Sequence, residues 1–487
     1  MGSWLLLLLI LLPVALVIVI SIMPLRLIRY VKFGPALASL INLLMLALMT
    51  HRVLNEGLLS FTIQFLKLTI LIDKFSFLFA MLITISTVLI SISSIPKLEE
   101  GVNLKIKAVN LIIFYIGAIY LCIAGDILSL VIAFLLINFS IFMALVKGNN
   151  IRTIEVGFKY LPLVITSTVV IIAGAILIYR TTGTSNLIDT ARSLSDLPLK
   201  IQILPLVLIL LGSAVQSGIF PFSTMISEVH FELPEIFFPL VPTIIITSQI
   251  YLIMRLTLMI FSIKVIFPYL VLFSILTVIF SETLALLAKD TKKTLIYSAY
   301  GAMGLILFAF SISSTEAISS SFLILINTIF AITSLFLING VFTNNDNHQT
   351  ELKTAGYQWK VLIFFILISI FSIMGIPPFT GFFAKFSLLV SLLEEIQWKT
   401  TIFIIIFILQ TVFQGIYLLR ILGTYFKAKD TIDTTWYLIG SIITFGVIIL
   451  ALSVLSNTLT NFTKNSALDF MQGFKYLYIP FLPGATP

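Results

Sequence analysis

Two side chains that can gain or lose a proton lie inside long apolar stretches of the 487-residue sequence, Lys385 and Glu282. A charge at the bilayer centre costs about 2.5–3.5 kcal/mol on insertion scales, so it needs a partner, a wetted cavity or loss of its proton. Lys385 therefore indicates ion or proton transfer; a lysine that snorkels to the surface or pairs with a neighbouring subunit is the alternative. Glu282 is either a proton acceptor or the structural partner of Lys289, and the structural pair is favoured.

The composition sets the class of protein. Hydrophobic residues make up 59% of the chain and charged residues only 10%, whereas an ordinary soluble domain has about 25% charged residues. This excludes a soluble enzyme, a disordered protein and a nucleic-acid-binding module. The net charge of +8 does not indicate nucleic acid, because the basic residues lie in short loops between apolar runs.

Residues that could hold a metal or a redox centre are scarce. The chain has one cysteine, Cys122, and three histidines that lie far apart in the sequence, His51, His230 and His348. A disulfide framework and a multi-cysteine cluster are therefore excluded, and a haem or zinc site is not favoured. We predict no metal site and no catalytic centre in this chain, so that any redox chemistry would belong to another protein.

About fourteen apolar stretches are long enough to span a membrane, which takes about 20 residues. They must be helices, because lipid satisfies no open sheet edge. The first has no basic region before it, so we predict a retained span rather than a cleaved signal. The stretches are 3–23, 35–50, 75–94, 108–124, 127–146, 160–179, 203–226, 235–258, 266–287, 294–313, 318–341, 359–393, 400–426 and 436–456.

The loops predict an orientation. Lysine and arginine are more frequent in one set of alternate loops than in the other, and cytoplasmic loops carry this excess. We therefore predict a multi-pass protein of the cell (cytoplasmic) membrane with both termini outside.

Two spans are interrupted. The seventh contains Pro221 within Gly212–Ser223, and the twelfth contains Pro377 and Pro378 within Gly375–Phe386. Proline removes an amide donor and clashes with the preceding turn, so both helices should part there. A spaced pair of broken helices indicates an inverted-repeat transporter with its ion site at the breaks. Either break alone could equally be a packing kink.

Several motifs resemble those of a known family, the antiporter-like membrane subunits. These occur in respiratory complex I, in membrane-bound hydrogenases and sulfur-reducing complexes, and in multisubunit sodium/proton antiporters. The resemblance covers residues 70 to 428. It rests on Asp290–Ser298 (DTKKTLIYS), Gly375–Phe386 (GIPPFTGFFAKF), a weakened motif over Phe220–His230 followed by Pro234, Tyr251 with Arg255, and Ile72–Phe77.

The resemblance implies a proton half-channel in each half of the chain. Its parts are a fifth-span glutamate paired with a seventh-span lysine, a relay lysine on the eighth or eleventh span, and a lysine or glutamate on the twelfth. Buried lysines and acids suit this task because their protonation follows their surroundings. Here Leu135 stands at the glutamate position, Gln216 at the seventh-span lysine and Thr247 at the eighth-span lysine. Only Lys385 keeps a charged group, so we predict that the first half-channel is closed.

The resemblance also implies an architecture. Two inverted five-helix repeats are expected at 108–258 (helices 4–8) and 266–426 (helices 9–13). Helices 1–3 precede them in 1–100, and a last span with an interfacial C-terminal tail follows in 436–487.

The implied function is that of an antiporter-like subunit in a complex that couples electron transfer to proton or sodium movement. Expected partners are other membrane subunits, the lipid bilayer and a peripheral redox arm holding iron–sulfur clusters, with no cofactor in this chain. A non-translocating scaffold and a stand-alone secondary transporter are the alternatives. The ion, the electron donor and the acceptor stay open.

Overall fold

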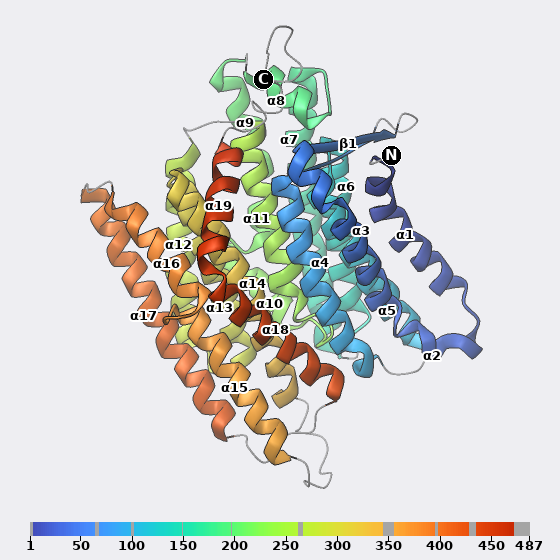
Figure 1. Cartoon of the computed structure of the whole chain (residues 1–487). Helices are drawn as coiled ribbons and strands as arrows, with labels where there is room; N and C mark the ends of the chain where they lie inside the picture. The colour runs from blue at the N-terminus through green and yellow to red at the C-terminus, as the bar shows by residue number, and fades with distance from the viewer. Residues whose placement is uncertain are drawn as a thin grey trace.

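The chain forms a bundle of membrane-length helices in the computed structural model (Figure 1). The structure describes residues 3–63, 68–98, 102–148, 150–195, 197–261, 266–343, 355–394, 398–427 and 435–471. Within these residues, 12 helices are long and apolar enough to cross a membrane, and three shorter apolar helices are Val241–Thr257, Trp359–Met374 and Thr380–Leu393. Together they account for the fourteen predicted stretches, so the all-α polytopic fold is confirmed.

The N-terminal helices flank a β-hairpin that the sequence analysis did not predict. Strands β1 (Leu58–Ile63) and β2 (Leu68–Asp73) are antiparallel, with Leu58 opposite Asp73. The segment is too short and too polar at its ends to read as a span, so its strand character was overlooked. The helices of this part are α1 (Ser3–Ile22), η1 (Leu25–Leu27), α2 (Ile28–Val31), α3 (Gly34–Glu56), α4 (Lys74–Ser94) and η2 (Ile95–Lys97).

The regular elements of the middle and the end of the chain are all helices among the described residues. Residues 102–260 form α5 (Val102–Ile123), α6 (Ile127–Val146), α7 (Ile151–Thr182), α8 (Leu187–Ser195), α9 (Leu199–Ser217), α10 (Ser223–Phe231), the π-helix η3 (Val241–Ile246), α11 (Thr247–Met254) and the π-helix η4 (Arg255–Ile260). Residues 267–471 form α12 (Phe267–Leu287), α13 (Thr291–Ser311), α14 (Thr315–Thr343), α15 (Ala355–Met374), α16 (Thr380–Leu393), α17 (Trp398–Lys427), α18 (Trp436–Val454) and α19 (Ser456–Met471).

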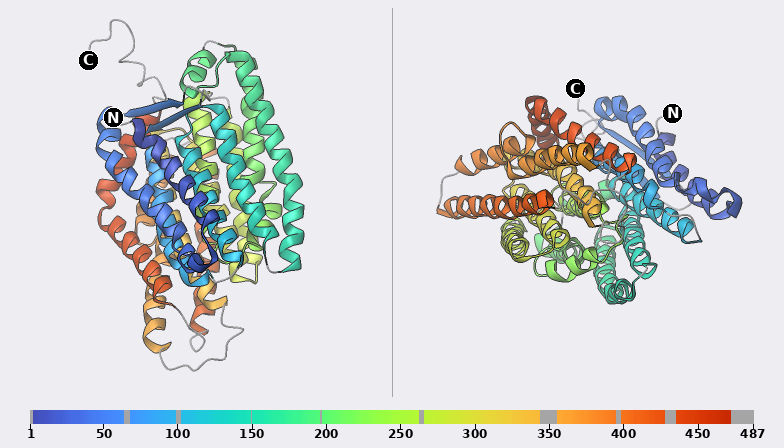
Figure 2. Two further views of the ribbon diagram at one scale, coloured as in Figure 1. Left: turned by 90° about the vertical axis from the view of Figure 1, so that its right-hand side faces the viewer. Right: turned by 90° about the horizontal axis from the view of Figure 1, so that it is seen from below.

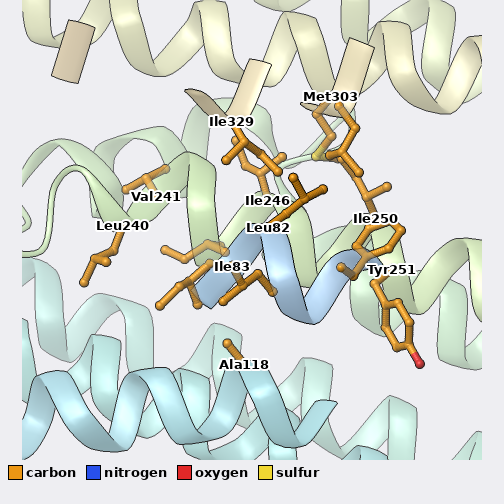
Figure 3. Close-up of a cluster of buried hydrophobic side chains, with 14 of the residues drawn as sticks. Leu82, Ile83, Ala118, Leu240, Val241, Ile246, Ile250, Tyr251, Met303 and Ile329 are labelled. Carbon is orange, nitrogen blue, oxygen red and sulfur yellow. The ribbon is translucent and has the colours of Figure 1, made fainter. Parts of the chain in front are cut away.

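Helices α13 and α14 lie in the interior of the bundle. In their most apolar windows, 94% of the α13 residues and 100% of the α14 residues are buried. Their inner side chains meet those of α4, α5 and α11 in a hydrocarbon cluster that includes Leu82, Ala118, Ile250, Met303 and Ile329 (Figure 3). The centre of the bundle is thus filled by apolar side chains.

The bundle is elongated in cross-section. Helix α17 lies at one end and α1 and α2 lie at the other (Figure 2). The start of α1 and the end of α19 lie toward the same end of the bundle, together with the hairpin and α8 (Figure 1). An even number of crossings gives this arrangement; which end faces outside remains a prediction.

Both predicted helix breaks are present. The chain leaves the helix between Ser217 and Ser223, around Pro221, and again between Met374 and Thr380, around Pro377 and Pro378. The repeat boundaries at 108–258 and 266–426 stay a prediction.

Helix α19 follows the last predicted span. Residues of α19 pack along α14, where the hydroxyls of Ser319 and Thr463 are 2.8 Å apart and Lys464 pairs with Glu316 at 2.7 Å. The interfacial tail is predicted over 469–478, and its part from residue 472 onward lies outside the described residues.

A buried ion pair joins the hairpin to the middle of the chain. Asp73 caps α4 by accepting from the Ser76 backbone N–H at 2.8 Å, and its second oxygen accepts from Arg255 at 2.5 Å. Both side chains of the pair are 0% exposed. The Arg255 guanidinium lies 6.0 Å from the centre of the Tyr251 ring, whose hydroxyl donates to the Cys122 carbonyl at 2.7 Å. Two of the motifs that resemble the family, Ile72–Phe77 and Tyr251 with Arg255, are therefore in contact through this ion pair.

The first prediction concerns this pair. We expect Arg255→Ala to lower the free energy of unfolding by about 3–5 kcal/mol, because it leaves the Asp73 carboxylate buried without its counter-charge. Thermal and denaturant unfolding in detergent measures the loss. Lys159→Ala is the control, because it removes a surface pair with Glu155 and should change stability little. An Arg255→Ala protein that unfolds like the control would contradict a structural role for the pair.

Candidate functional site

Glu282 lies on α12 and is 1% exposed. Its Oε1 accepts a hydrogen bond from Gln410 Nε2 at 3.1 Å, while its Oε2 has no partner among the described residues. Gly301 on α13 makes room for the carboxylate, since a Cβ there would collide with Oε1. The expected pairing with Lys289 is wrong: that lysine is exposed beyond the end of α12, and no ion pair joins the two described residues.

Lys385 lies on α16, one turn after the second break, and is half-buried. Its Nζ donates to Gln414 Oε1 at 2.6 Å and to the Met374 carbonyl at 3.3 Å. Met374 is the last residue of α15, so the ammonium satisfies a carbonyl that the break has freed. The amine is thus held inside the protein and does not snorkel to the surface.

Helix α17 supplies the partners of both charged residues. Gln410, Gln414 and Tyr417 are 2%, 2% and 0% exposed, and a spacing of four and then three residues places them on one face of the helix. Tyr417 donates to Ser298 Oγ on α13 at 2.9 Å. These three residues are not among the site residues predicted from the sequence, although their helical spacing within an apolar span is a usable signal. Through them, Glu282 and Lys385 are connected along adjacent turns of one helix.

A small polar cavity adjoins Lys385. Its volume is about 20 Å³, and Gln414, Asn327 and Thr328 contribute to its lining. A cavity of this size and polarity can hold one water molecule. Asn327 Nδ2 also donates to the carbonyl of Ser372 at 3.2 Å, so a second carbonyl near the break is satisfied by a side chain.

The predicted neutral positions of the first half lie in different surroundings. Leu135 points out of the bundle and is 40% exposed. Gln216 is buried and donates to Ser167 Oγ on α7 at 3.1 Å. Thr247 donates to the Pro242 carbonyl at 2.8 Å, within its own segment. The structure therefore does not bring Leu135 and Gln216 together.

The first break lies beside an apolar groove. The Phe220 N–H donates to Thr277 Oγ1 on α12 at 3.0 Å. The groove next to it has a volume of about 460 Å³. Its lining residues are Ile203, Leu206, Val207, Leu210, Leu211, Ala214, Ile219, Phe220, Pro221, Phe222, Ile253, Ile266, Tyr269, Leu270 and Phe273. No charged side chain is among them, in contrast to the second break.

The acidic loop after α10 is neutralised by neighbouring basic residues. Glu232 pairs with Arg152 at 2.9 Å, and Glu235 pairs with Lys97 at 3.3 Å. Among the described residues, no group of three His, Cys, Asp or Glu side chains is placed to hold a metal ion.

The arrangement defines a class of membrane protein: a helical bundle with two interrupted spans and a half-buried, hydrogen-bonded lysine beside the second. The sequence agrees with this class, since residues 124–414 match the family model described as NADH:quinone oxidoreductase/Mrp antiporter, TM. The chain belongs to this family of antiporter-like membrane subunits.

Individual relatives come from two kinds of assembly. The chain is 30% identical over 285 residues to NADH-quinone oxidoreductase subunit N of Wolbachia sp. subsp. Brugia malayi (strain TRS), a match that covers 57% of this chain and 61% of that protein. It is 24% identical over 360 residues to a Na(+)/H(+) antiporter subunit of Bacillus subtilis (strain 168), a match that covers 72% of this chain and 73% of that protein. The chain thus spans less than two thirds of the first relative.

The fold matches a solved structure over nearly its whole length. A chain from the membrane-bound sulfane sulfur reductase, an archaeal respiratory membrane complex, has a TM-score of 0.85 and 20% sequence identity, covering 98% of this chain and 99% of that one. At 20% sequence identity, this likeness establishes the fold alone and not a shared function.

The second prediction tests the slot that holds Glu282. We expect Gly301→Ala to lower the free energy of unfolding by about 1–3 kcal/mol, because the added methyl group overpacks the site against the carboxylate. Unfolding in detergent is the measurement. Gly423→Ala on α17 is the matched control, because a Cβ there meets nothing within 4 Å, so helix propensity favours it. Equal stability of the two variants would refute the tight packing of Glu282.

Proposed function

We propose that this chain is a subunit of an ion-translocating membrane complex in which ions pass only through its second half. Lys385 and Glu282 are the ion-translocation residues, and the first half-channel is closed. The observation that carries the proposal is the Lys385 amine, which is held inside the bundle beside the second break and is linked through α17 to Glu282.

The surroundings of the second break support a path for ions. Lys385 and Asn327 satisfy carbonyls at the end of α15, and the Ser453 hydroxyl accepts from the Thr380 N–H at 3.0 Å. A cavity large enough for one water molecule adjoins the lysine. Polar groups, a wettable space and a titratable residue therefore occur together, which is what proton exchange at membrane depth needs.

The first half offers no titratable side chain at the corresponding family positions. Leu135 faces outward, Gln216 is held by a hydroxyl, and Thr247 bonds to its own backbone segment. At the first break the Phe220 N–H donates to the Thr277 hydroxyl, and the break lies beside an apolar groove. These neutral groups cannot hold or pass a charge, which supports closure of the first half-channel.

The relatives support an assembly. Two are named as subunits, and the structural neighbour is a respiratory membrane complex. We infer that this chain lies in the cytoplasmic membrane, with both termini outside, beside other membrane subunits and a peripheral redox arm. Iron–sulfur clusters are expected in that arm. The chain is further inferred to contain two inverted repeats at 108–258 and 266–426.

The third prediction tests the role of Lys385. We expect Lys385→Ala to reduce ion translocation by about 10²-fold or more, the scale of a positioned proton-transfer group, while the complex still assembles. The rate is measured per assembled complex in sealed vesicles. Gln216→Leu is the comparison in the first half and should leave the rate unchanged. Wild-type translocation by an assembled Lys385→Ala complex would reject this proposal in favour of a scaffold.

The fourth prediction concerns partners. Purification in mild detergent should retain other membrane subunits together with iron–sulfur proteins, detected by their iron content and visible absorption. Recovery of small membrane subunits without iron–sulfur proteins would contradict a redox-driven complex. It would indicate a multisubunit antiporter instead. An isolated, active monomer would overturn the assembly and support a stand-alone transporter.

A further inference from the structure

We propose that a groove between α1, α5 and α6 binds an anionic phospholipid, with an acyl chain along the groove and the phosphate at Lys105. The groove has a volume of about 280 Å³. Lys385 and Glu282 are not among its lining residues, so the inference is independent of the proposed ion path. The lining residues are Ser21, Lys105, Ile106, Val109, Asn110, Ile113, Phe139 and Met143.

The length of the groove is apolar and open to the surface of the bundle. Ile106, Val109 and Ile113 are spaced by three and four residues, so they lie on one face of α5. Phe139 on α6 is 51% exposed, and Ile22 at the end of α1 is 75% exposed. These helices have membrane length, so hydrocarbon covers this surface. An acyl chain packs against it without leaving a polar group unsatisfied.

Two of the three polar lining residues are satisfied within the protein. Asn110 Nδ2 donates to the Ser140 carbonyl at 3.0 Å, and Asn110 Oδ1 accepts from Ser140 Oγ at 2.7 Å. The Ser21 hydroxyl donates to the Val17 carbonyl at 2.7 Å. The remaining polar group of the lining is the Lys105 ammonium.

Lys105 lies in the first turn of α5 and is half-buried. Its Nζ donates to the Met23 carbonyl, just beyond the end of α1, which fixes the ammonium at the end of the groove. An ammonium has three N–H donors, so two are left for a ligand. Among the described acidic residues, none forms an ion pair with Lys105. The amine therefore offers a positive charge and two donors to an anion.

The surroundings of this amine are basic. Arg26 follows α1, Lys147 follows α6, and α2 packs against α5 at this end of the bundle (Figure 1). The segments 20–32, 102–113 and 139–148 contain several basic residues but no Asp or Glu. This end is the predicted cytoplasmic one, and basic pockets between membrane helices on that side suit anionic headgroups.

A membrane helix of another subunit is the alternative occupant. An apolar helix would cover Ile106 and Val109, but it would leave the Lys105 charge without a counter-ion at the edge of the hydrocarbon, which is unfavourable. A phospholipid carries a hydrocarbon chain and a phosphate in one molecule. Its phosphate lies at the level of the helix ends, where the first turn of α5 places Lys105. The lipid therefore matches both parts of the site.

Lipid retention by the full chain tests the inference. The chain is purified in mild detergent and mixed with equal amounts of phosphatidylglycerol and phosphatidylcholine, and bound lipid is counted by native mass spectrometry. We expect phosphatidylglycerol to be retained in preference, because it alone has a net negative charge. Lys105→Gln keeps an N–H donor but removes the charge, so it should lower this retention about fivefold, the effect of one basic residue near a membrane surface. Lys105→Arg should keep it.

A second variant tests the apolar part of the groove. Val109→Phe fills the groove with a ring and should also lower lipid retention, because the acyl chain loses its place. Ile165→Phe is the matched control, since Ile165 on α7 is 54% exposed and does not line the groove. Lys159→Gln is the control for charge, because it removes a lysine of α7 that also lies outside the groove. Both controls should retain the wild-type amount of lipid.

Photo-cross-linking in native membranes identifies the occupant directly. A benzophenone side chain in place of Ile106 should form an adduct with phospholipid, detected by mass spectrometry of the purified chain. This readout needs no change at Lys105, so it stands even where the lysine variants fold poorly. An adduct with another polypeptide would show a subunit in the groove and would overturn the inference. A folded Lys105→Gln chain with the wild-type preference for phosphatidylglycerol would overturn it as well.

Discussion

Hydrocarbon offers no hydrogen bonds, so each charge and each broken helix at membrane depth must be satisfied by the protein itself. Asp73 and Arg255 are an example, because both side chains are fully buried and each charge is balanced by the other. The carboxylate also caps α4, and Tyr251 beside the guanidinium bonds to α5. One ion pair thereby fixes the hairpin, α4, α5 and the α11 segment relative to one another, and the apolar centre of the bundle packs around them.

The two broken helices show how the same local cause leads to different sites. Proline interrupts both spans. At the first break the Phe220 N–H bonds to the Thr277 hydroxyl, and an apolar groove lies beside it. At the second break, Lys385, Asn327 and Ser453 bond to the freed backbone groups. A proline therefore leaves backbone groups that need hydrogen-bond partners. The side chains of the neighbouring helices determine whether one of these partners is titratable.

Much of this arrangement follows from sequence. Fourteen apolar stretches and two proline breaks are local features, and they were predicted because lipid imposes their length and their helical form. The partners of Glu282 were not, because Gln410 is 128 residues away and packing alone brings them together. Lys289, near in sequence, lies beyond the helix end and is exposed. The hairpin was missed because short strands carry a weaker pattern than membrane helices.

The buried charges of the second half can be compared with the neutral residues at the corresponding positions of the first half. Replacing a buried ion pair by apolar residues is often neutral or stabilising, whereas removing one partner leaves a costly unpaired charge. Leu135, Gln216 and Thr247 in the first half carry no charge that needs such compensation. Lys385 and Glu282 each impose a cost of burial, and α17 uses two buried glutamines to offset it. Burying these two groups adds nothing to stability that apolar residues would not supply, which accords with the proposed use of their charges.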